Sequence, residues 1–91
     1  MQYKFKEEKY LKEVKKYIDG TYGQHYVTKN NFQALDGIME SGHGEGFIFG
    51  NLQKLPARYG KKEGRNRKDI LKIIHYGILA LYHHDHYGEE E

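Results

Sequence analysis

Six polar residues in the second half of the chain have types and spacing suited to capturing an anion. They form two groups with the same i, i+3, i+7 spacing: Asn51, Lys54 and Arg58, then Asp69, Lys72 and Tyr76. Residues three, four and seven apart share one face of a helix, so each group predicts a polar line along a helix. Lysine and arginine attract phosphate, asparagine adds a neutral donor, and a tyrosine ring stacks on a nucleobase. The pattern therefore predicts a site for a phosphorylated ligand.

Positive charge gathers around the same residues. The chain has 15 Lys and Arg against 13 Asp and Glu, a net charge of only +2. Residues 54–72 nevertheless hold eight basic and two acidic residues, which favours binding of phosphate or carboxylate there. The alternative is an ordinary surface ion pair between Arg58 and Asp69 with solvated lysines around it, worth under about 1 kcal/mol.

Apolar periodicity predicts four helices that would position these residues, in an all-α domain without strands. The first helix covers residues 4–19 and is closed by Gly20, and Asn30 is the predicted N-cap of a short second helix. The third covers residues 45–59, and the fourth begins after the N-cap Asn66.

A short connection predicts that the third and fourth helices pack antiparallel. That packing would place the two polar lines opposite each other and create a positive groove. The predicted facing pairs are Arg58 with Asp69, Lys54 with Lys72, and Asn51 with Tyr76.

Two features modify this helical prediction. Pro56 removes a backbone donor, so we expect a kink or a break in the third helix near residues 52–56. The fourth helix is apolar around most of its axis, which indicates a central position or a subunit interface. We expect residues 82–91 to fray at the end of the chain.

Composition narrows the class of protein. A chain of 91 residues forms one domain and buries only roughly 60–65% of its unfolded surface, so we expect a thin core helped by self-association. The chain has neither a cysteine nor a long apolar run, and its N-terminal segment is charged. These features favour a cytoplasmic protein that does not enter a membrane.

Two further segments are candidate binding sites. His83, His84, Asp85 and His86 are crowded enough to hold a divalent metal, but near the chain end we interpret them as a solvated tail and expect no metal site. The glycines of residues 41–47 precede a helix N-terminus, which either binds an anion with help from His43 or is a simple turn.

Several motifs resemble a family of small bacteriophage proteins, the SaV-like group. They are HY (His25, Tyr26), FQALDGIME, GF-x-x-GN-x-x-K-x-x-x-R-x-G-K-K-x-G (residues 46–64) and D-x-x-K-x-x-x-Y (residues 69–76). The resemblance covers residues 25–82, with residues 1–20 as an added amphipathic helix and residues 83–91 as a tail. Its most specific part is the spaced set Asn51, Lys54, Arg58, Lys62, Asp69, Lys72 and Tyr76.

This resemblance implies a phage protein in the infected host cell, with a helical fold, an oligomeric state and a nucleotide-like ligand. The favoured function is sequestration of a small nucleotide, for which a host immune-signalling nucleotide is the candidate. Phosphates would lie on Lys54, Arg58 and Lys72, the base or ribose on Asn51, and a ring would stack on Tyr76 or Tyr26.

Other functions stay open. Family members are often described as nucleotide kinases, by similarity to a podophage deoxynucleoside monophosphate kinase, and ATP would be a cofactor only in that case. Asp69 would then orient the two cations that stabilise the transferred group, yet GKKEG lacks the hydroxyl residue of a phosphate-binding loop. An inhibitor of a host protein is a third possibility. Long nucleic acid is disfavoured because the basic patch is short and the tail is acidic.

Overall fold

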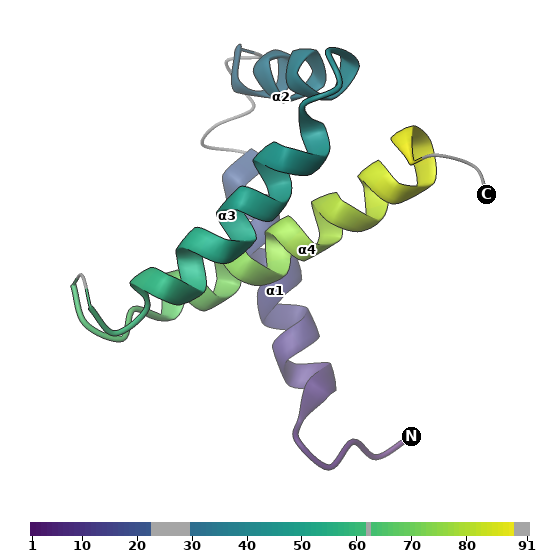
Figure 1. Ribbon diagram of the computed structural model, residues 1–91. Coiled ribbons are helices and arrows are strands. Elements are labelled where there is room, and N and C mark those ends of the chain that lie inside the picture. Colours follow the sequence, from purple (N-terminus) through teal and green to yellow (C-terminus); the bar gives the residue numbers. More distant parts are fainter. Residues whose placement is uncertain (23–29, 62, 89–91) are drawn as a thin grey trace.

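The computed structural model describes residues 1–22, 30–61 and 63–88, which form four helices and no strand (Figure 1). The helices are α1 (Glu7–Thr21), α2 (Asn30–Glu40), α3 (Gly44–Arg58) and α4 (Arg67–Tyr87). The predicted all-α class is confirmed. None of the described helices is long and apolar enough to cross a membrane.

Helices α3 and α4 form the main pair and run in opposite directions, as predicted (Figure 1). The turn that joins them is closed by a hydrogen bond from the Gly60 amide to the Gly64 carbonyl, 3.0 Å long. Both glycines have positive φ, a conformation that costs a residue with a side chain about 1 kcal/mol or more. The Asn66 side chain accepts from the Lys68 amide at 2.9 Å and so caps α4, which confirms the predicted N-cap.

Helix α3 continues through Pro56 to Arg58, so the break considered at residues 52–56 does not occur. Pro56 lies in the last turn, where few further backbone bonds depend on it. A bend at this position stays a prediction.

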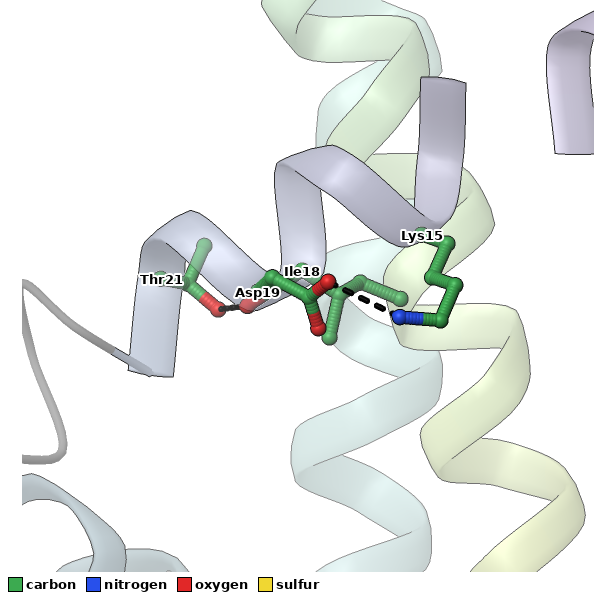
Figure 2. A network of polar contacts seen from close by, with 4 residues as sticks. All are labelled: Lys15, Ile18, Asp19 and Thr21. Atoms are coloured by element: carbon green, nitrogen blue, oxygen red, sulfur yellow. Dashed lines mark hydrogen bonds and ion pairs between the residues drawn. The ribbon is translucent and has the colours of Figure 1, made fainter. Parts of the chain in front are cut away.

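Helix α1 crosses the α3 and α4 pair and contacts α4 (Figure 1). It begins at Glu7 and not at Lys4, because Lys6 adopts a left-handed conformation with φ of 60°. It passes through Gly20, which was expected to close it, and ends at Thr21. Figure 2 shows this end, where the Thr21 hydroxyl donates to the Ile18 carbonyl at 2.7 Å.

Helix α4 extends to Tyr87, so the prediction that residues 82–91 fray is wrong over most of that segment. Two stacked pairs stabilise the last turns, Tyr82 with His86 and His83 with Tyr87. The Tyr87 hydroxyl also donates to the Glu40 carboxylate at 3.0 Å and ties this end to α2.

The core is thin, as composition predicted. Within the described residues, four apolar side chains are buried: Val14, Met39, Ile48 and Leu55. The radius of gyration is 14.7 Å, against about 12 Å expected for a globular chain of this length. The four helices therefore make an open arrangement with much of its apolar surface exposed.

Candidate functional site: a cationic pocket between four helices

A pocket of about 540 Å³ lies where the four helices meet. Helix α1 contributes Tyr17 and Thr21 to its wall, and α2 contributes apolar side chains that include Leu35 and Ile38. Helices α3 and α4 supply the remaining lining residues. This volume lies within the range of roughly 300–1,000 Å³ that is typical of small-molecule sites.

Five of the predicted site residues line this one pocket. They are Asn51, Lys54 and Arg58 from α3, with Lys72 and Tyr76 from α4. The antiparallel helix pair therefore brings the two polar lines together, as their spacing predicted.

Arg58 is held by Asp69, and the predicted proximity of these two residues is confirmed. The Arg58 Nη2 atom lies 2.5 Å from Asp69 Oδ1. The pair differs from an ordinary surface ion pair because the Asp69 side chain is only 5% exposed. Asp69 does not itself line the pocket; it fixes the direction of the guanidinium, whose other donors remain available to a ligand.

Lys54 and Lys72 provide the uncompensated positive charge of the pocket. In the described part of the chain neither has an ion-pair partner, although Lys72 is half-buried. Since Asp69 neutralises Arg58, the three cations and one carboxylate leave a net charge of about +2 on this wall. The arrangement is suited to an anion of matching charge.

Aromatic groups make up another part of the wall. The Phe47 and Tyr76 rings meet edge to face with centroids 6.2 Å apart, and Tyr17 meets His75 in the same way at 6.2 Å. Such rings offer faces on which a flat heterocycle can stack.

These aromatic side chains are uncharged at neutral pH. Burial raises the pKa of Tyr76, and burial together with the neighbouring Tyr76 raises the pKa of Tyr17. Burial lowers the pKa of His75, which keeps its imidazole neutral. Among the described residues, the charge of the pocket therefore comes from lysine and arginine alone.

Most of the apolar and aromatic part of the wall was missed by sequence reasoning. Tyr17 and His75 were not among the predicted site residues, and neither was any residue of α2. No local pattern predicts that α1 crosses α4 at this point, since the contacts join residues more than 50 positions apart: Arg67 bonds Glu13 through Nε and Nη2, and Tyr17 meets His75.

Among the described residues, His43 does not line this pocket. Lys62, His25 and Tyr26 lie outside the residues that the structure describes. His43 is the N-cap residue of α3 and makes no side-chain capping bond. Within the described residues, no three His, Asp or Glu side chains come together as a metal site. His83, one of the histidines considered for such a site, instead packs against Gly44, where an added Cβ atom would lie 2.7 Å from its ring.

The fold and this pocket define a small all-α protein with a cationic and aromatic pocket between its helices. The chain belongs to a family described as a protein of unknown function, DUF3310, which it matches over residues 21–77, more than half of its length. The matched region contains α2, α3 and the part of α4 that carries Lys72, His75 and Tyr76. No curated protein and no solved structure matches the chain.

Proposed function

We propose that this protein binds a small phosphorylated nucleotide in the pocket between its four helices. The observation that carries the proposal is the convergence of Lys54, Arg58 and Lys72 on one pocket that also holds Tyr76 and Phe47. Cations and aromatic faces within one cavity match a ligand with both a phosphate and a flat base.

Charge matching limits the kind of ligand. A wall with a net charge of about +2 is balanced by one phosphate monoester dianion or by two bridging phosphates. Lys54 and Lys72 contact the phosphate oxygens, and Arg58, already oriented by Asp69, adds paired donors. Asn51 contacts the base or the ribose and Tyr76 stacks on the base.

The ligand is held and not turned over in this proposal. Phosphoryl transfer ordinarily uses carboxylates to hold a metal and to position the nucleophile. In the described part of the chain no carboxylate lines the pocket, and Asp69 is engaged by Arg58. Sequestration requires only preformed donors. We place this activity in the cytoplasm of a phage-infected cell, with a host immune-signalling nucleotide as the ligand.

A binding screen tests the proposal. Purified protein is titrated with mono-, di- and cyclic nucleotides, first by thermal shift and then by calorimetry. A true ligand at about 100 times its dissociation constant stabilises the folded chain by roughly 2.7 kcal/mol. The absence of any shift or heat across the panel would contradict the proposal.

A turnover assay separates holding from catalysis. Protein is incubated with labelled nucleoside monophosphates and ATP, and the complex with any ligand is then heated and analysed. Recovery of the unaltered ligand is expected. Product beyond one equivalent per subunit would instead assign the pocket to a nucleotide kinase, and a stoichiometric host protein co-purified without nucleotide would favour an inhibitor.

A further inference from the structure

Helix α4 carries a stripe of exposed apolar side chains. The stripe consists of Ile70, Ile74, Ile78 and Leu81, which are between 38% and 66% exposed. Their spacing of four, four and three residues keeps them on one side of the helix. Four large aliphatic side chains in a row form an apolar patch of the kind that marks an interaction surface.

This stripe lies on the side of α4 away from the pocket. Successive residues are rotated by about 100° around a helix axis, so Tyr76 lies roughly 160–200° from Ile74 and Ile78. Lys72, Tyr76 and Leu79 face the pocket. Helix α4 therefore lines the pocket with one face and presents aliphatic side chains on the opposite face.

The chain exposes more surface than a typical globular monomer of the same mass. The accessible surface is 7484 Å² for a mass of 10.8 kDa. A monomeric globular protein of that mass exposes about 5,500 Å², so roughly 1,900 Å² is in excess, more than twice the about 800 Å² that each partner buries in a standard interface. This excess is large enough to include a standard protein interface.

We propose that the stripe docks against the same stripe of a second copy of this chain, with the two α4 helices antiparallel. A two-fold axis level with residue 76 places Ile74 opposite Ile78 of the other copy, and Ile70 within one residue of the position opposite Leu81. Each contact then occurs twice, and aliphatic side chains meet only aliphatic side chains.

Charge at the two ends of the stripe supports this register. The same axis places Arg67, at the start of α4, opposite Asp85 near its end. The Glu13 carboxylate occupies Arg67 Nε and Nη2, so Nη1 is left for a second carboxylate. Asp85 has no ion-pair partner in the described part of the chain. A parallel alignment would instead place Arg67 beside Arg67.

Mass measurement with a variant tests whether the stripe is the interface. Light scattering after size exclusion is expected to give twice 10.8 kDa for the native chain. Ile74→Glu introduces a carboxylate twice into the apolar contact and is expected to weaken association at least roughly 100-fold, giving a monomer. Gln53→Glu adds the same charge at an exposed position of α3 and is expected to leave the dimer intact.

A monomeric native chain at 100 µM would overturn the proposal, as would a dimer unaffected by Ile74→Glu. The stripe is exposed in the single chain, so circular dichroism of that variant should match the native spectrum. If the variant does not fold, cross-linking decides the matter.

Cysteine cross-linking tests the antiparallel register. The chain has no cysteine of its own, so Ile70→Cys and Leu81→Cys each introduce a single thiol. Co-expressed under different tags, the two variants are expected to form a mixed disulfide on mild oxidation. Neither should link to itself, since equivalent positions lie about 15–18 Å apart along the axis, beyond the roughly 7 Å between Cα atoms that a disulfide allows. Self-linking without mixed product would overturn the register.

This inference does not depend on the proposed function. In the antiparallel dimer the two pockets face outward on opposite sides, so each subunit binds its ligand independently. Nucleotide titration of a monomeric Ile74→Glu protein should give the native affinity, and failure of nucleotide binding in both proteins would count against the pocket alone.

Discussion

At the scale of single residues, Lys72 is the most informative position in the pocket. It is half-buried beside Tyr76 and His75, with no ion-pair partner in the described part of the chain. Because its charge makes no ion pair within the described residues, that charge is available to a ligand. Substitution of such a residue is expected to change the affinity for a ligand without changing the stability of the free protein.

Lys72→Ala is therefore expected to abolish the thermal shift caused by a nucleotide while leaving the melting temperature of the free protein within a few degrees of native. Lys68→Ala is the control, because Lys68 is an exposed lysine of the same helix that does not line the pocket. An undiminished shift in the Lys72 variant would rule out contact between Lys72 and the ligand.

His75 makes stability depend on pH in a defined direction. Burial lowers the pKa of its imidazole, so as pH falls the unfolded chain takes up this proton first. Its contribution to stability is complete above the ordinary histidine value of about 6.5 and is lost as pH falls below it. Melting temperatures between pH 8 and pH 5.5 should fall less steeply in His75→Gln than in the native chain. His84→Gln, at an exposed position outside the pocket, should keep the native slope.

At the scale of elements, one ion pair joins α3 to α4 beside the pocket. Asp69→Ala leaves the partly buried Arg58 without its carboxylate, and we expect a loss of about 1–3 kcal/mol in the free energy of unfolding by urea. Lys15→Ala breaks the exposed pair with Asp19 and is expected to cost under about 0.5 kcal/mol (Figure 2). Equal losses in the two variants would show that burial does not strengthen the Arg58 pair.

The close packing of α3 against the end of α4 requires a glycine at position 44. A Cβ atom at Gly44 would lie 2.7 Å from His83 Cδ2 and 3.1 Å from Met39 Cγ. Since His83 is stacked on Tyr87 and Met39 is buried, neither can easily give way. Gly44→Ala should lower the melting temperature. Gly37→Ala, in α2 with open space around it, should raise it, because alanine favours a helix by about 0.5–1 kcal/mol.

Local signals predicted the helices well and their ends less well. Periodicity and the Asn66 cap gave the α3 and α4 pair, because these features depend on residues close in sequence. The end of α4 was missed because its stability comes from distant partners, Gly44 packing on His83 and Glu40 accepting from Tyr87. Gly20 was expected to end α1, but it stays in the helix and Thr21 supplies the last side-chain bond.

At the scale of the whole molecule, the same distinction explains how much of the pocket could be predicted. The wall from α3 and α4 follows from two lines of spaced residues and one short connection. The wall from α1 and α2 follows from how helices far apart in sequence pack, which residue spacing does not encode. Sequence therefore predicted the charged part of the pocket but neither Tyr17 nor Leu35.

All four helices contribute to one pocket, although α1 and α2 have fewer contacts with the rest than α3 and α4 have with each other. A ligand in the pocket would therefore contact all four helices and stabilise the packing of α1 and α2 against α3 and α4. Amide hydrogen exchange followed by mass spectrometry should slow in α1 and α2 when nucleotide is bound, with little change in the paired segments of α3 and α4. The bound ligand would then supply packing contacts that the thin core of this short chain lacks.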